Sequence, residues 1–136
     1  MALTSGQVAK KSGVGVETLR FYEREGLLPE PARLASGYRQ YPAAAVERVR
    51  FVRRAQLLGF QLKDIKELLA LRDDPDAESR EVRDKAVAKL ADIDQRIRDL
   101  EAMRAELTRL VAACDGSGPA AHCPILTAIG DDVRPA

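Results

Sequence analysis

Residues 3–28, LTSGQVAKKSGVGVETLRFYEREGLL, predict two short helices joined by a tight turn. A Thr-Ser pair supplies side-chain oxygens that can cap a first helix over about 6–12. Gly13 breaks that helix, and a second helix is expected over about 16–24. Gly26 stands where a helix ends in a left-handed residue, a position that favours glycine. Helix, glycine turn and helix together predict a helix-turn-helix.

A small β element is expected after this unit. Pro29 and Pro31 exclude helix, and residues 37–41, GYRQY, combine a glycine with alternating Tyr, Arg and Tyr. This pattern favours a short hairpin, or wing. Apolar residues at helical spacing then predict two further helices, over about 43–58 and 61–71, which can pack on the first pair.

The segment from 77 to 113 contains neither Gly nor Pro, which predicts one long helix. A helix this long has no small core of its own to cover its apolar stripe, so we expect a second copy of the chain to pack against it. Packing against the N-terminal helices is the alternative. Met103 and Leu110 widen this stripe, and Arg104 interrupts it. Its members, spaced three to four residues apart with that interruption, are Leu90, Ile93, Ile97, Leu100, Leu107 and Val111.

These elements define an expected organisation that is predominantly α-helical. Residues 1–72 form a winged helix-turn-helix domain, and 77–113 form a dimerisation helix. Between them, 72–76 reads as a hinge because it contains a proline. Residues 114–129 form a loop and a short apolar turn, and 130–136 are expected to be a disordered tail.

Charge is divided unevenly along the 136 residues. Residues 1–66 carry 12 Lys and Arg against 6 Asp and Glu, a balance of +6, whereas 67–136 carry 10 against 15, a balance of −5. This polarity fits a nucleic-acid-facing end, although ordinary solvated helix faces are an alternative explanation. No apolar run has the length of a signal peptide or a membrane span, so we expect a soluble, cytoplasmic protein.

The second helix and the wing offer the groups that would read double-stranded DNA. In a helix-turn-helix, polar side chains of the second helix meet bases and phosphates in the major groove. Wing residues would hold the flanking backbone, while Leu19 and Phe21 are expected to face the core or the wing. The candidate DNA-contacting residues are Lys11, Val16, Glu17, Thr18, Arg20, Tyr22, Arg33, Tyr38, Arg39 and Tyr41.

Two cysteines, Cys114 and Cys123, follow the long helix with eight residues between them. In a reducing compartment a close Cys pair indicates metal binding or redox activity more than a structural disulfide. Thiolates are soft ligands that select Cu(I), Zn(II) or heavy metals. A disulfide switch is the competing interpretation, because the loop is long enough to close. An enzyme is not expected, since there is one His, no phosphate-binding Gly loop and no nucleophile–base set.

Four motifs carry a resemblance to the MerR family of transcription regulators: residues 3–28, SGYRQY at 36–41, RAQLLGFQLKDIKELL at 54–69 and CDGSGPAAHCPIL at 114–126. The resemblance implies a homodimer joined by an antiparallel coiled coil. It also implies a promoter with an overlong spacer, which the inducer-bound protein distorts so that RNA polymerase can engage it. The residues that match DNA-contacting positions of the family are Arg20, Tyr22, Arg33, Tyr38 and Arg39.

The resemblance also bears on the metal. Divalent-ion sensors of the family have a third Cys near the start of the long helix, and the matching residue here is Ser79, as in the copper-efflux branch. This implies Cu(I), Ag(I) or Au(I) bound by Cys114 and Cys123, and control of metal-efflux or detoxification genes. The eight-residue spacing departs from that branch and is more common among mercury and lead sensors. A divalent ion (Zn, Cd, Pb or Hg) is therefore the alternative, with His122 or Asp115 as further ligands.

Overall fold

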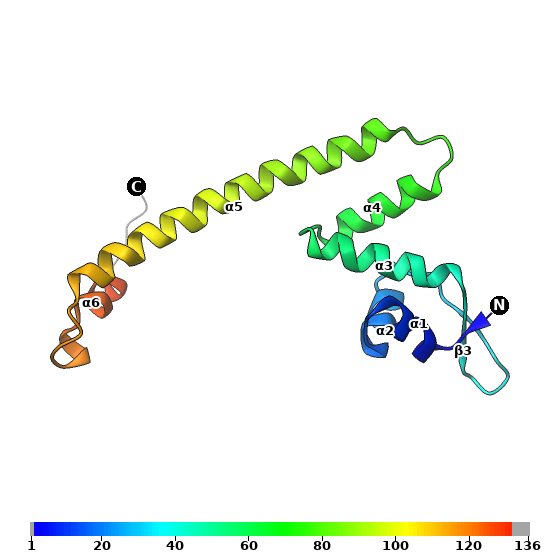
Figure 1. Ribbon diagram of the computed structural model, residues 1–136, viewed down its shortest axis with the longest axis horizontal. Coiled ribbons are helices and arrows are strands. Elements are labelled where there is room, and N and C mark those ends of the chain that lie inside the picture. The colour runs from blue at the N-terminus through cyan, green and yellow to red at the C-terminus, as the bar shows by residue number, and fades with distance from the viewer. Residues whose placement is uncertain (1, 132–136) are drawn as a thin grey trace. The chain divides into compact units, whose positions relative to one another are not determined.

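The computed structural model describes residues 2–131 and divides the chain into two compact units, Met1–Lys89 and Leu90–Ala136. The fold is predominantly helical, as the sequence predicts, with one small three-stranded sheet (Figure 1). Among the described residues, no helix is both long and apolar enough to cross a membrane.

The predicted helix-turn-helix is present in the first unit. Helix α1 spans Ser5–Ser12 and α2 spans Val16–Arg24. Helix α1 begins one residue earlier than predicted because Thr4 alone is the cap: its hydroxyl accepts from the Gln7 backbone N–H, and the Gln7 side chain accepts from that of Thr4. Gly13 ends α1 with φ +75°, a left-handed conformation that favours glycine.

The wing is formed by β2, Ala32–Arg33, and β3, Arg39–Pro42, which pair antiparallel. A third strand, β1 at Ala2–Leu3, pairs with the other edge of β3, so the sheet order is β1-β3-β2. Strand β1 was not predicted, because a two-residue strand has no periodicity of its own and exists through its pairing with β3.

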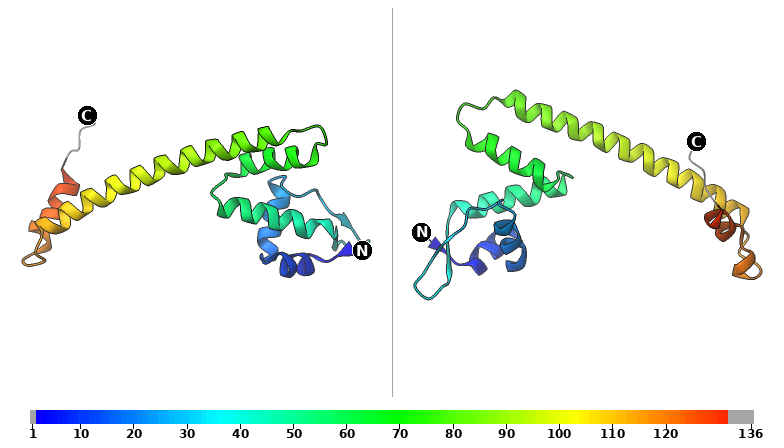
Figure 2. Two further views of the ribbon diagram at one scale, coloured as in Figure 1. Left: turned by 45° about the horizontal axis from the view of Figure 1, so that its top comes forward. Right: turned by 180° about the vertical axis from the view of Figure 1, so that it is seen from behind.

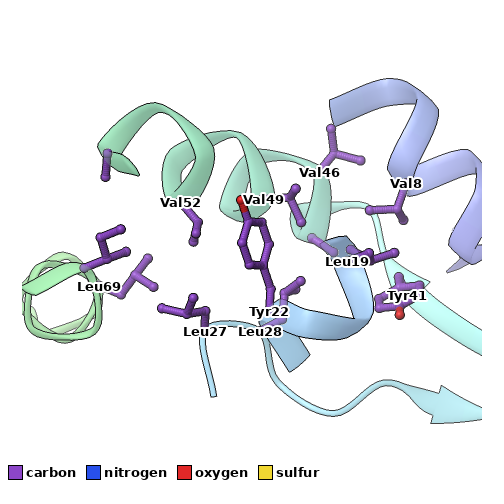
Figure 3. Close-up of a cluster of buried hydrophobic side chains, with 13 residues drawn as sticks. Val8, Leu19, Tyr22, Leu27, Leu28, Tyr41, Val46, Val49, Val52 and Leu69 are labelled. Atoms are coloured by element: carbon purple, nitrogen blue, oxygen red, sulfur yellow. The ribbon is translucent and has the colours of Figure 1, made fainter. Parts of the chain in front are cut away.

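Two further helices complete the core of the first unit: α3 at Ala44–Leu57 and α4 at Leu62–Asp73. Helices α1 and α2 lie together against α3 (Figure 2). Helix α4 extends into the segment predicted as a hinge, where Arg48 links its end to the core by donating to the Leu27 carbonyl at 2.9 Å and to Asp73 at 3.0 Å. The largest fully buried side chains, most of them shown in Figure 3, are Tyr22, Tyr41, Leu19, Leu27, Ile65, Leu69, Val8, Val49 and Val52.

Helix α5 spans Ser79–Ala113, and its first turns belong to the first unit. There Lys85 pairs with Glu67 of α4. The Lys89 side chain lies over Gly59 in the turn between α3 and α4, where a Cβ would come within 3.1 Å of Lys89 Cε. The start of α5 is therefore packed on the helices that follow the wing.

The second unit contains the remainder of α5, a 3-10 turn η1 at Ala120–His122 and α6 at Pro124–Gly130. Leu110 is buried in this unit, whereas most of the apolar stripe along α5 is exposed. Gly130, predicted to start a disordered tail, is the last residue of α6. The rest of that prediction, from residue 132 onward, lies outside the described residues.

Candidate metal centre and nucleic-acid interface

The end of α5 and the start of α6 bring the two cysteines together. Cys114 directly follows α5, and Cys123 is the N-cap of α6. Their Sγ atoms lie 3.5 Å apart, both thiols are free, and both residues are half-buried. Gly116 and Gly118 have φ of +82° and +81°, so the intervening loop turns back through two conformations that favour glycine.

The N-terminal end of α6 makes Cys123 a more acidic thiol. The backbone N–H groups of Leu126 and Ile125, with the Cys114 thiol adding a smaller effect, lower the pKa of Cys123 below its ordinary value. A thiolate is both the nucleophilic and the metal-binding form of cysteine. The position of Cys123 therefore favours the protonation state that a metal site requires.

The neighbouring polar residues of the loop do not join this pair. Asp115 accepts from the backbone N–H of Ser117 at 2.9 Å and from its hydroxyl at 2.6 Å, and these two contacts hold the pKa of Asp115 below its ordinary value. His122 is exposed on η1. Within residues 2–131 no group of three His, Cys, Asp or Glu is arranged to hold a metal. Neither His122 nor Asp115 is thus brought to the cysteines as a third ligand.

Ser79 is the first residue of α5, whereas Cys114 follows its last residue. The two residues stand at opposite ends of a 35-residue helix and belong to different units. That Ser79 lies near the cysteine pair of a partner subunit stays a prediction.

Several of the candidate DNA-contacting residues lie on the surface of the first unit. Lys11, Glu17 and Arg20 are exposed, and Val16 and Thr18 are half-buried. In the wing, Tyr38 is 74% exposed. Arg33 is also exposed and donates to the Gly37 carbonyl at 3.1 Å. Arg39 is half-buried and pairs with Glu23 of α2.

Two predicted contacts, Tyr22 and Tyr41, are corrected by their burial. They are 2% and 1% exposed, and burial raises the pKa of both phenols. The Tyr22 hydroxyl donates to the Gln56 side chain at 2.7 Å. Tyr22 lies three residues after the buried Leu19 and so shares its face of α2, a signal present in the sequence. Both rings are core residues with almost no surface to offer DNA.

A basic cluster on α3 was not predicted. Arg50, Arg53 and Arg54, with Ser12 and Leu57, line a hollow of about 210 Å³. Arg50 donates to the Lys11 carbonyl at 2.7 Å, so the cluster adjoins the end of α1. The repeated arginines in RVRFVRR, residues 48–54, were the available signal.

A helix-turn-helix with a small β wing and a basic surface defines a DNA-binding transcription regulator rather than an enzyme. The chain belongs to the MerR family: the model described as "MerR HTH family regulatory protein" matches residues 3–71, and the one described as "MerR, DNA binding" matches residues 46–110.

Individual relatives cover almost the whole chain. The mercuric resistance operon regulatory protein of Serratia marcescens is 44% identical over 98% of this chain and 91% of its own length. The HTH-type transcriptional regulator CueR of Yersinia pestis is 39% identical over 90% and 87%. The crystal structure of PbrR691 from Ralstonia metallidurans CH34 in complex with lead(II) has 36% identity and a TM-score of 0.84, covering 94% of this chain and 99% of that one.

Proposed function

We propose that the protein is a metal-responsive transcription regulator in which Cys114 and Cys123 capture a soft ion. The observation that supports this most is the contact of two free thiols, 3.5 Å apart, at the junction of α5 and α6. A bound ion would replace thiol protons with a link between the last turn of the long helix and the first turn of α6. Metal binding would therefore fix the start of α6 to the end of α5.

A monovalent ion, Cu(I), Ag(I) or Au(I), fits this donor set better than a tetrahedral divalent ion such as Zn(II). Soft monovalent ions are satisfied by two thiolates, whereas a tetrahedral divalent ion needs four ligands. Among the described residues of one chain, no third His, Cys, Asp or Glu accompanies the pair. Ser79, where a partner subunit would offer a ligand, carries a hydroxyl, which is a hard donor.

The apolar stripe of α5 supports a homodimer. Leu100, Leu107 and Val111 are 60%, 53% and 63% exposed on one face of the helix. Burying such a seam against the α5 helix of a second copy is the usual way to stabilise a long two-stranded helix. An antiparallel arrangement would place Ser79 of one subunit near the cysteines of the other. The dimer would bind promoter DNA in the cytoplasm and activate efflux or detoxification genes by distorting the DNA for RNA polymerase.

A divalent ion, such as Hg(II) or Pb(II), is the second candidate. Eight residues separate the cysteines, a spacing that favours the divalent branch of the family. The similarity to a mercuric resistance regulator and to a lead(II)-bound structure also supports it. On this reading a partner subunit, or solvent, completes the coordination.

The function is tested by metal-dependent transcription from the operon that the protein controls, with Cys114→Ser and Cys123→Ser as variants. Each variant is expected to retain DNA binding and to lose induction completely. Ser117→Ala is the matched control, because it alters the same loop without removing sulfur, and it should respond to metal. Induction that survives either cysteine substitution would exclude the proposed sensor.

The identity of the ion is tested by competition between Cu(I), held at a defined free concentration by a chelator, and Zn(II), Pb(II) or Hg(II). The monovalent assignment predicts that Cu(I) or Ag(I) induces at the lowest free concentration, and that Ser79→Cys improves the response to divalent ions. Stronger induction of the unmodified protein by a divalent ion would favour the second candidate. Induction by an oxidant without metal would instead indicate that the two thiols form a disulfide.

A further inference from the structure

A polar cluster lies beneath the wing of the first unit. Glu23 in the last turn of α2 places Oε2 3.2 Å from Arg39 Nε, and the two side chains are 10% and 23% exposed. Tyr41, two residues after Arg39 on β3, is buried beside the same carboxylate. Alternate residues of a strand share a face, so Arg39 and Tyr41 both point from β3 toward α2.

One carboxylate oxygen of Glu23, Oε2, lies within ion-pair distance of Arg39. Glu23 Oε1, Arg39 Nε and the Tyr41 hydroxyl are buried without a hydrogen-bond partner among the described residues, so the contact between Glu23 and Arg39 is an ion pair rather than a hydrogen bond. A buried carboxylate is costly unless a cation compensates it, and Arg39 is the cation in contact with it. The Glu23 side chain is therefore tied to the position of the Arg39 guanidinium.

The exposed part of Arg39 lies in a cavity of about 490 Å³ between the wing and the first residues of α1. Arg20 of the second helix and Tyr38 of the wing line the same cavity, and both are exposed. Two arginines and a phenol converge there, which is a donor set suited to a DNA phosphate.

We propose that Glu23 is a positioning residue for DNA binding: it holds Arg39 through Nε, so that the remaining guanidinium N–H groups face a phosphate in the cavity shared with Arg20 and Tyr38. This inference rests on the proposed DNA contacts of those three residues. Holding the guanidinium in place lowers the conformational entropy that Arg39 loses when DNA binds.

Charge alone and the proposed role of Glu23 predict opposite changes in DNA affinity when Glu23 is removed. Removing an acidic side chain near DNA reduces repulsion and should strengthen binding. If Glu23 positions Arg39, its removal weakens binding instead, and the loss disappears once Arg39 is also removed. If Glu23 only supports the fold, the loss remains whether or not Arg39 is present.

The test measures the affinity of metal-free, reduced full-length protein for a duplex that the unmodified protein selects from a random pool. Glu23→Ala is expected to bind about 10-fold more weakly with an unchanged salt slope, because the phosphate contacts keep their number. Arg39→Gln is expected to bind more weakly and to lower the slope by about 0.9, the value for one phosphate. Glu23→Ala with Arg39→Gln should bind no more weakly than Arg39→Gln alone.

Glu25→Gln is the matched control. Glu25 directly follows the same helix and forms no ion pair among the described residues, so this substitution removes a carboxylate that does not hold an arginine. It should bind as tightly as the unmodified protein, or slightly more tightly. If Glu23→Ala unfolds, as judged by circular dichroism, Glu23→Gln keeps the side-chain volume and completes the same cycle.

Binding by the Glu23 variant that equals or exceeds that of the unmodified protein would overturn the proposal. An equal loss in the Arg39→Gln background would also overturn it, by assigning Glu23 to the fold. Because no metal is used, a failed metal response in the preceding experiments leaves this result interpretable.

Discussion

The N-terminal unit buries most of its large apolar side chains wholly or in part, whereas the C-terminal unit leaves most of them in solvent. In the first unit Leu19, Val49 and Ile65 have no exposed surface. In the second unit Leu100 and Leu107 are more than half exposed, and Leu110 is the buried leucine of that part of α5. The two units are built from the same kinds of residue but differ in how far one chain covers them.

This difference separates two sources of stability. The first unit packs helices, a wing and a turn around one core, so its contacts lie within one chain. The second unit offers a helix with one apolar face, and such a face is stabilised by a partner. Substitutions in the first unit should therefore change the free energy of unfolding, while those along α5 should change self-association.

The largest expected effect comes from placing charges in the exposed seam. Leu100→Glu with Leu107→Glu should weaken self-association by about a thousandfold or more, because each dimer would bury four carboxylates. Sedimentation velocity over a range of concentrations measures this. Ala102→Glu with Ala105→Glu adds the same charge on the opposite face of α5 and should leave association unchanged. If the unmodified protein and both double variants associated equally, the apolar face of α5 would not be the dimer contact.

The second prediction compares one substitution in the two units. Leu19→Ala should destabilise the first unit by about 3 kcal/mol, because it removes a fully buried side chain. Leu100→Ala should change the unfolding of that unit by less than about 0.5 kcal/mol, as for surface sites. All three tyrosines lie in residues 22–41, so tyrosine fluorescence in urea reports on the first unit alone. Similar losses in the two variants would contradict the separation of the units.

The third prediction concerns the tyrosines of the first unit. Tyr22→Phe removes the hydrogen bond to Gln56 and should cost about 1 kcal/mol of stability without changing DNA affinity. Tyr38→Phe alters an exposed ring and should leave stability unchanged while lowering DNA affinity severalfold. Urea unfolding and a DNA-binding titration on both variants provide the measurement. If Tyr22→Phe lowered DNA affinity without changing stability, Tyr22 would be a DNA contact rather than only a core residue.

The smallest effect expected is a pH shift in the second unit. The Leu126 and Ile125 N–H groups lower the pKa of Cys123 in the folded chain, so its alkylation rate should reach half its maximum at a lower pH than in urea. Because the pKa of Cys123 is lower in the folded chain than in the unfolded chain, its ionisation stabilises the folded loop at pH values above the pKa of the unfolded chain. This stabilisation is lost as the pH falls through the pKa of the folded chain. The comparison uses Cys114→Ser to isolate one thiol. If the alkylation of Cys123 had the same midpoint pH in the folded and unfolded chains, α6 would not lower the pKa of this thiol.

Local signals in the sequence were enough to predict the helices. The cap at Thr4, the glycine at Gly13 and the Gly- and Pro-free run before Cys114 each determine structure within a few residues. Strand β1 could not be predicted in this way, because its two residues become a strand through pairing with Tyr41 and Pro42, almost forty residues away.

The candidate sites were predicted in part. The close approach of Cys114 and Cys123 agrees with their spacing. The exposure of Arg20 and Tyr38 agrees with their helix and wing positions. The pairing of Arg39 with Glu23 depends on how β3 packs against α2, which no local pattern encodes.

The line between the two units falls between Lys89 and Leu90, inside α5 rather than in a linker. Proteases normally cut between domains because the connecting chain is exposed and flexible. Here the peptide bonds at the boundary are enclosed in helical hydrogen bonds, and an enzyme must unwind several turns before it can cut. Brief trypsin digestion should therefore release fragments that end outside residues 79–113 and keep both halves of the helix on one piece.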